Sequence, residues 1–111
     1  MYDGALRFME AGRHAMVKRD LERQNTNLQK AQRVVLELMA CLDMTQGGDV
    51  SKNLFALYSY VVDELVKANI EDDLAAADRA IKVMSDLRES WSELQKSLRK
   101  GEGEDSEKLA A

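Results

Sequence analysis

The stretch Ser51–Asn69 reads SKNLFALYSYVVDELVKAN, and it decides the fold because it is a long helical repeat without a helix breaker. On a helix that turns about 100° per residue, one set of its apolar side chains falls on a face about 100° wide. These residues are Val50, Leu54, Leu57, Tyr58, Val61, Leu65 and Ala68. A face of this width is typical of a helix in a bundle core, and Ser51 is predicted to cap the helix.

A second apolar strip, formed by Phe55, Val62 and Val66, lies beside this face and widens the apolar arc to about 180°. A helix in a small bundle does not need so wide an apolar surface. Exposed apolar strips usually mark interaction sites. The pattern leaves two interpretations open: the strip is buried within the chain, or it binds a partner.

Composition favours a single all-α domain. The chain has 111 residues, of which 45% are apolar and 32% charged, and it contains no proline. The net charge of -4 argues against a nucleic-acid partner, which normally meets a basic surface. A single cysteine cannot form an internal disulfide, which fits the cytosol. The sequence has no run long and apolar enough for a membrane span and no signal-peptide core, so membrane insertion is not expected.

Two further helices are predicted before the central stretch. The first covers Tyr2–Lys18, where Gly12 on the apolar stripe indicates the close approach of a neighbouring helix. The second begins after its predicted cap Asp20 and runs from Leu21 to about Leu42. Its core positions repeat by sevens, which is typical of left-handed bundle packing, and Leu36 lies outside them. They are Leu21, Leu28, Ala31, Val35, Leu38 and Leu42.

The fourth helix is predicted to begin at Asp72 or Asp73, after a short polar turn. Its seam alternates by three and four residues, and its Trp91 is expected to be a buried structural residue. The seam comprises Ala77, Ala80, Met84, Leu87, Trp91, Leu94 and Leu98. Short connections make consecutive helices antiparallel, so residues 1–98 are predicted to form an up-down-up-down four-helix bundle. Residues 99–111 read as a frayed acidic tail whose last four residues are typical of a cloning remnant.

Candidate catalytic and metal-ligating residues are few. His14 is the only histidine and Cys41 the only cysteine, too few for a structural zinc site or a two-metal bundle site. His14 is interpreted as a partly exposed helix residue, and Cys41, within an apolar run, as a small inert hydrophobe. The carboxylates fall on predicted solvent faces, where nothing marks a catalytic pair. The sequence therefore predicts no catalytic residue, no metal, no cofactor and no enzymatic activity.

Three short motifs follow the pattern of one protein family. The opening Tyr2-Asp3-Gly4-Ala5-Leu6-Arg7-Phe8 is similar to an LYDGAL-type stretch. A signature of the form GG-x(4)-NL-x(2)-LY-x-Y-x(4)-L-x(2)-AN is matched by Gly47-Gly48, Asn53-Leu54, Leu57-Tyr58, Tyr60, Leu65 and Ala68-Asn69. Leu87 and Trp91 match a closing L-x(3)-W. From Met1 to about Leu94 the chain thus resembles the FliS family, the flagellin-specific export chaperones.

The resemblance implies a cytoplasmic, non-enzymatic four-helix bundle. Members of the family bind the disordered C-terminal segment of flagellin, keep it from polymerising, and deliver it to the flagellar type III export gate. It implies that segment as the partner of this chain and export-gate components as further partners, with a monomer in the client complex. Partner contact is predicted at Phe55, Val62 and Val66, with Tyr60, Asn53 and Leu36 as neighbours.

One alternative belongs to another class of protein. A structural bundle could use the extra strip of the third helix to form a homodimer or larger assembly. The start of the chain carries a separate expectation: Met1–Gly4 already lies inside the helical pattern without a capping residue, so residues upstream are expected. Such a segment could fold over the apolar strip and be displaced by the client.

Overall fold

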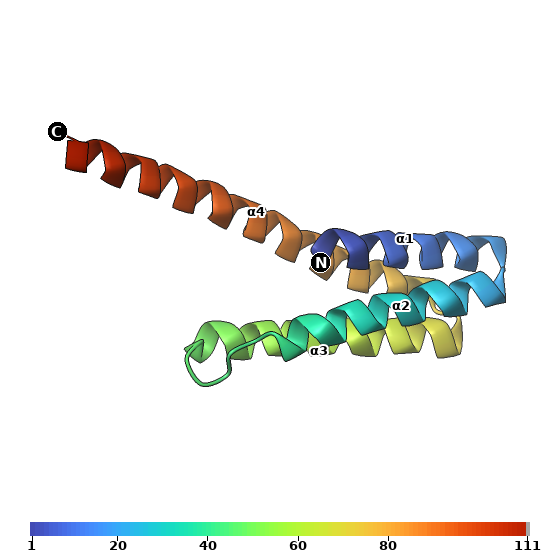
Figure 1. The fold of residues 1–111 in the computed structure, drawn as a ribbon. Coiled ribbons are helices and arrows are strands. Elements are labelled where there is room, and N and C mark those ends of the chain that lie inside the picture. Colours follow the sequence, from blue (N-terminus) through green and yellow to red (C-terminus); the bar gives the residue numbers. More distant parts are fainter. Residues whose placement is uncertain (111) are drawn as a thin grey trace.

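The computed structural model describes the backbone of residues 1–110 and the side chains of residues 1–98. Four helices and no strand occur in this part of the chain: α1 (Tyr2–Lys18), α2 (Leu21–Ala40), α3 (Gly48–Glu71) and α4 (Leu74–Ala110). Consecutive helices run in opposite directions (Figure 1). Each packs against the next, and α4 closes the ring against α1. The predicted all-α, antiparallel bundle is confirmed.

The core is built from one narrow strip on each helix. On α3 the strip consists of Tyr58, Val61, Leu65 and Ala68. The full cluster comprises Ala5, Met9, Leu28, Ala31, Val35, Tyr58, Val61, Leu65, Ala68, Ala76, Ala77, Ala80 and Met84. Its small alanines on α4 let that helix approach α1 and α3 near the closed end of the bundle.

The turns at the closed end follow the predicted caps. Arg19 ends α1 in the left-handed conformation, and the carboxylate of Asp20 accepts a hydrogen bond from the Arg23 backbone N–H at 3.2 Å. Asp72 ends α3 in the same left-handed way. The Asp73 carboxylate then accepts from the Ala76 N–H at 3.2 Å, so Asp73 caps α4.

The connection between α2 and α3 differs from the prediction. Helix α2 ends at Ala40, and α3 begins at Gly48 with Gly47 as its cap, so Ser51 is a buried helix residue and not the N-cap. The Asp43 carboxylate organises the loop by accepting bonds from the backbone N–H groups of Thr45 and Gln46. The bond from Gln46 first, and then a bond from the Thr45 hydroxyl, hold the pKa of Asp43 below its ordinary value.

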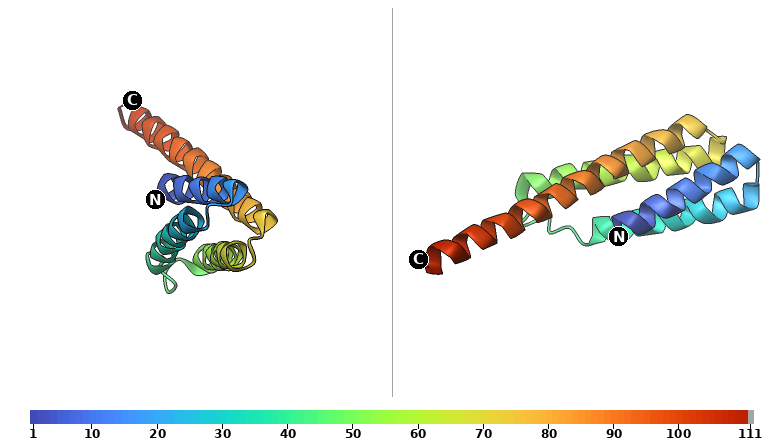
Figure 2. Two further views of the ribbon diagram at one scale, coloured as in Figure 1. Left: turned by 90° about the vertical axis from the view of Figure 1, so that its right-hand side faces the viewer. Right: turned by 90° about the horizontal axis from the view of Figure 1, so that it is seen from above.

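Helix α4 leaves the bundle at the open end, and this overturns part of the predicted core. It continues past the start of α1 (Figures 1 and 2) and gives the chain a longest extent of 62 Å. Because α4 diverges here, it no longer covers Leu57 of α3, which is 39% exposed. Val50 is also exposed. Trp91 is 49% exposed, and Leu94 and Leu98 beyond it are exposed too. The predictions that Trp91 is buried and that Leu57 is core are therefore wrong.

Two other expectations on α2 are also wrong. Leu21 is exposed because the helix begins with it at the rim of the bundle, and the Cys41 thiol is exposed because α2 has already ended. The side chains of residues 99–110 and residue 111 lie outside the described part. The division into a bundle domain and a frayed tail stays a prediction.

Candidate partner-binding surface

The second apolar strip of α3 lies outside the bundle core. Phe55 is 41% exposed, while Val62 and Val66 are half-buried. Val62 packs against the core cluster from its edge, whereas Phe55 and Val66 do not belong to it. By helical spacing, Phe55 and Val62 lie within about 40° of Val66, so the three form one wall on the side of α3 that faces α2.

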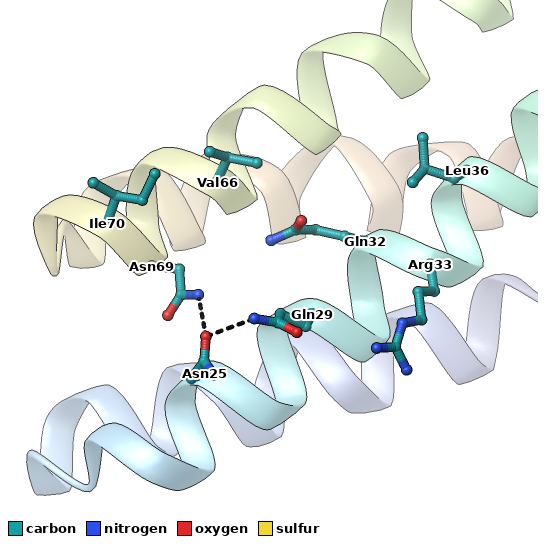
Figure 3. A pocket seen from close by; sticks show the side chains of 8 residues that line it. All are labelled: Asn25, Gln29, Gln32, Arg33, Leu36, Val66, Asn69 and Ile70. Atoms are coloured by element: carbon teal, nitrogen blue, oxygen red, sulfur yellow. Dashed lines mark hydrogen bonds between the residues drawn. The ribbon is translucent and has the colours of Figure 1, made fainter.

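A groove between α2 and α3 receives part of this wall. It is a cavity of about 420 Å³ lined by Asn25, Gln29, Gln32, Arg33 and Leu36 of α2 and by Val66, Asn69 and Ile70 of α3 (Figure 3). Leu36, predicted from its place outside the heptad seam, is 50% exposed and faces this groove. The structure thus brings Leu36 and Val66 together across the two helices. We call this site the α2/α3 groove.

Ile70 extends the apolar wall by one helical turn. It was not predicted as a site residue, because it falls in the stretch that the sequence predicts as a short polar turn before the fourth helix. It is 76% exposed, the most exposed side chain of the groove wall. The spacing Val62, Val66, Ile70 repeats by four residues, so the sequence did contain the signal that Ile70 shares their face.

One end of the groove is lined by side-chain amides, which we call the amide cluster: Asn25, Gln29, Gln32 and Asn69. The Asn25 oxygen accepts from Gln29 Nε2 at 2.9 Å and from Asn69 Nδ2 at 2.8 Å (Figure 3). Nearby, the buried Gln24 donates to the Asp72 carboxylate at 2.8 Å. The Asn69–Asn25 and Gln24–Asp72 bonds cross from one helix to the other and hold α2 and α3 in their antiparallel alignment. The amide cluster thus places polar hydrogen-bonding groups beside an otherwise apolar surface.

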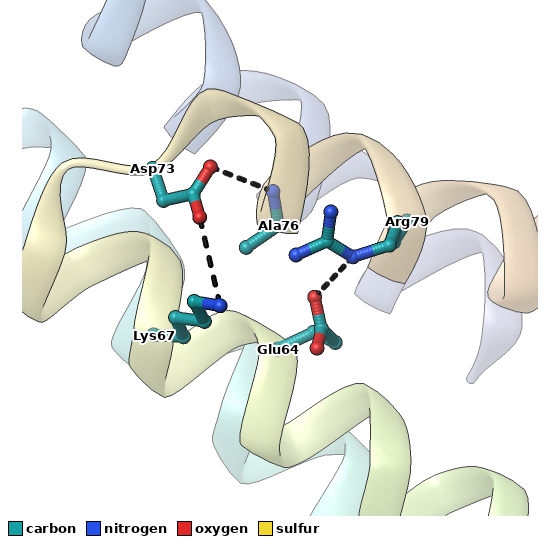
Figure 4. A network of polar contacts seen from close by, with 5 residues as sticks. All are labelled: Glu64, Lys67, Asp73, Ala76 and Arg79. Carbon is teal, nitrogen blue, oxygen red and sulfur yellow. Dashed lines mark hydrogen bonds and ion pairs between the residues drawn. The ribbon is translucent and has the colours of Figure 1, made fainter.

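Tyr60 and Asn53 lie on a different side of α3. Their positions differ from that of Val66 by about 120° or more, toward α4. There Arg79 Nε donates to Glu64 at 2.7 Å, and Lys67 lies 3.9 Å from Asp73 (Figure 4). The pKa of Arg79 is raised first by the Glu64 bond and to a lesser degree by nearby acidic groups, including the Tyr60 phenol. The structure does not bring these two predicted neighbours to the groove.

The open end of the bundle holds a second, largely apolar cavity of about 410 Å³. It is lined by Met1, Tyr2, Leu38, Cys41, Leu42, Leu54, Tyr58 and Trp91. Two of these lining residues, Tyr2 and Tyr58, have their hydroxyl groups 2.5 Å apart and form a hydrogen bond. Burial first, and the bond to Tyr2 second, raise the pKa of Tyr58 above its ordinary value. No sequence pattern had joined these residues, because they come from all four helices.

Neither surface contains a metal centre. Among the described residues, no three His, Cys, Asp or Glu side chains lie together in a way that could hold a metal ion. His14 is an exposed residue of α1. No described helix combines the length and the apolar character that a membrane crossing requires.

Comparison with known proteins assigns this chain to a family. Residues 1–98 match the family described as "Flagellar protein FliS". The flagellar secretion chaperone FliS of Bacillus subtilis is 33% identical over 100 residues, which cover 90% of this chain and 74% of that protein. The flagellar secretion chaperone FliS of Vibrio cholerae is 30% identical over 82% of this chain and 67% of that protein. That of Salmonella typhimurium is 28% identical over 85% and 70%.

These matches make the protein one of the flagellar secretion chaperones. The chain belongs to the FliS family. The resemblance inferred from the Tyr2–Phe8 and Gly47–Asn69 motifs is thereby confirmed, and chaperones of this kind are in general not enzymes.

Proposed function

We propose that this chain is a cytoplasmic export chaperone for flagellin. It binds the disordered C-terminal segment of flagellin, prevents premature polymerisation, and delivers the segment to the flagellar type III export apparatus. The observation that carries the proposal is the α2/α3 groove, where the exposed Leu36 and Ile70 and the half-buried Val66 present apolar side chains outside the core of a FliS-family bundle.

The dimensions of the apolar wall suit a helical segment. Phe55 and Ile70 are fifteen residues apart on α3, which corresponds to about 22 Å or four helical turns. An amphipathic client segment that folds in the groove would lay its apolar face on this wall, as in other helix-in-groove complexes. The same face would then be unavailable for contacts with other flagellin molecules, so polymerisation would be blocked.

Release of the client requires no nucleotide or metal in this proposal. A segment that folds on binding loses conformational entropy, so the net affinity is lower than the contact area alone would give. Components of the export gate could then take over the client by competition. This makes the gate the second partner of the chain.

A peptide titration tests the proposal. A flagellin C-terminal peptide is added to the protein, and binding is followed by calorimetry, helix content by circular dichroism, and mass by light scattering. We expect a gain in helix content and a 1:1 complex. A protein that is already a dimer and gives no heat with the peptide would instead support a structural bundle that assembles through the α3 strip.

A further inference from the structure

We propose that the outer surface of the α1–α2 hairpin docks an acidic amphipathic helix of a second protein, other than flagellin. This surface has basic side chains around a half-buried apolar strip, and we call it the basic face. It comprises Arg7, Lys18, Arg23 and Lys30, with Phe8, Ala11 and Val34 between them. None of these residues lines the α2/α3 groove or the cavity at the open end. The proposal therefore concerns a separate surface and goes beyond the proposed function.

The basic side chains form two rows on neighbouring helices. Arg7 and Lys18 are eleven residues apart on α1, so they differ by only about 20° around the helix and lie about 16 Å apart along it. Arg23 and Lys30, seven residues apart on α2, also differ by about 20°. All four residues are exposed. Because α1 and α2 are packed, antiparallel neighbours, the two rows run side by side (Figure 1).

A contact between the two helices shows that the rows belong to one surface. The Lys30 ammonium group lies 5.7 Å from the centre of the Phe8 ring, so the α2 row is turned toward α1. Around α1, Ala11 lies between Phe8 and Lys18. Around α2, Val34 is within about 40° of Lys30. Phe8, Ala11 and Val34 are half-buried, and Phe8 and Val34 pack against the core cluster. The middle of the basic face is therefore apolar.

The positive charge of the basic face is largely uncompensated. Three of its basic residues, all except Arg23, form no ion pair with any residue between 1 and 98. Arg23 lies 3.5 Å from Asp20 in an exposed pair, which screens only part of its charge. Glu22 is turned about 100° away from Arg23 around α2. Glu37 lies about two turns beyond Lys30 toward the open end. An acidic partner would supply the missing counter-charges.

The opposite sign prevails on the other side of the bundle. Residues 43–73, which form α3 and the connections at its two ends, carry seven acidic and two basic residues, and the net charge of the chain is -4. This region repels an acidic partner while the basic face attracts it, so charge complementarity fixes where the partner docks. A nucleic acid or an anionic membrane fits less well, because an extended polyanion would also meet the acidic region.

The spacing of the rows suits a helix. They follow two helices whose axes lie about 8–10 Å apart, and a helix with its side chains is about 10–12 Å wide. A helix along the basic face would lay apolar side chains on its middle and direct an acidic side chain toward each row. Lys30 and Leu36 differ by about 120° around α2, so the basic face and the α2/α3 groove lie on different sides of this helix. Both surfaces can therefore be occupied at once.

A designed peptide serves as the probe for this test. It has about 18 residues, a length of about 27 Å as a helix, with leucine and alanine on one face and glutamate on both flanks. One control peptide has lysine in place of each glutamate, and a second has the same residues in scrambled order. Binding to the full chain is followed by fluorescence anisotropy. We expect the glutamate peptide to bind at least about tenfold more tightly than either control, and to lose affinity as the salt concentration rises.

Charge reversals locate the binding surface. Arg7→Glu and Lys30→Glu each change one row, and each should weaken binding of the glutamate peptide about three- to tenfold. Lys52→Glu is the matched control, because Lys52 is an exposed lysine of α3 that forms no ion pair with residues 1–98. It makes the same change in net charge and should bind as wild type does. Circular dichroism verifies that all three variants fold.

Several results would overturn the inference. These are no binding of the glutamate peptide, equal binding of its scrambled form, or an equal effect of Lys52→Glu and Lys30→Glu. Phosphatidylserine vesicles or single-stranded RNA that bind more tightly than the peptide, and lose binding in Lys30→Glu, would instead assign the basic face to a polyanion.

Competition separates this inference from the proposed function. The flagellin C-terminal peptide should not displace the glutamate peptide, because the two occupy different sides of α2. Displacement would place both peptides on one surface and overturn the inference. If the glutamate peptide binds as expected and the flagellin peptide does not bind at all, the proposed function is wrong while the basic face remains a docking surface.

Discussion

Gly12 of α1 lies directly against Leu28 of α2: a Cβ atom added to the glycine would be 2.6 Å from Leu28 Cδ2 and 2.9 Å from Leu28 Cγ. Leu28 is fully buried and cannot move aside without disturbing the core. The glycine therefore sets the distance between the first two helices, as its place on the apolar stripe of α1 had predicted.

The first prediction follows from this contact. Gly12→Ala gains up to about 1 kcal/mol of helix propensity, but overpacking against Leu28 costs about 1–3 kcal/mol, so the variant should be less stable. Gly4→Ala is the matched control, because a Cβ at Gly4 meets no atom within 4 Å. It should leave stability unchanged or raise it by about 0.5–1 kcal/mol. Urea unfolding measures both, and equal stabilisation by the two changes would contradict the close contact.

The second prediction concerns the exposed stretch of α4. Trp91→Ala removes a side chain that is half in solvent, so it should lower the free energy of unfolding by less than about 1 kcal/mol. Met84→Ala, one heptad earlier on the same seam and fully buried, should cost about 2–5 kcal/mol. Denaturant unfolding of the two variants measures both losses. A comparable loss of unfolding free energy for the two variants would show that Trp91 is a core residue.

The third prediction is a pH dependence from the tyrosine pair at the open end. The pKa of Tyr58 is raised in the folded state, so this residue contributes stability that is fully present below its unfolded pKa of about 10. The contribution is lost as pH rises from that value toward the folded pKa. Tyr58→Phe should therefore lose less stability than wild type between about pH 8 and pH 11.

Tyr60→Phe is the control for this measurement, because Tyr60 is an exposed tyrosine of the same helix. Chemical unfolding at the two pH values should give the wild-type difference for Tyr60→Phe. A similar alkaline loss of stability in wild type and Tyr58→Phe would show that the buried phenol does not contribute to it.

The helices and their contacts within the closed end could be predicted because local rules decide them. The Asp20 cap, the bounds of α1 and the close approach at Gly12 each depend on residues near in sequence. The divergence of α4 could not be predicted in this way. A heptad pattern predicts that Met84, Trp91 and Leu98 share a face of α4. It does not predict how far the neighbouring helices continue beside that face.

The candidate site was predicted in its apolar half only. Leu36 and Val66 were predicted because large apolar residues outside a core stripe are conspicuous in a sequence. The amide cluster was missed, although Asn25, Gln29, Gln32 and Leu36 repeat at helical spacing on one face of α2. Polar residues on a solvent face are ordinary, so only the placement of α3 opposite that face distinguishes them.

The central claim, that the α2/α3 groove is the flagellin-binding surface, is tested most directly by one pair of variants in the peptide titration. Leu36→Asp places a charge in the groove, and Val17→Asp places the same charge on α1 at a residue of similar exposure, 50% against 56%. Leu36→Asp should weaken binding of the flagellin peptide at least about tenfold, because the charge must be desolvated against the apolar face of the client. Val17→Asp should bind as wild type does. Equal affinities for Leu36→Asp and wild type, with both proteins folded, would contradict the claim.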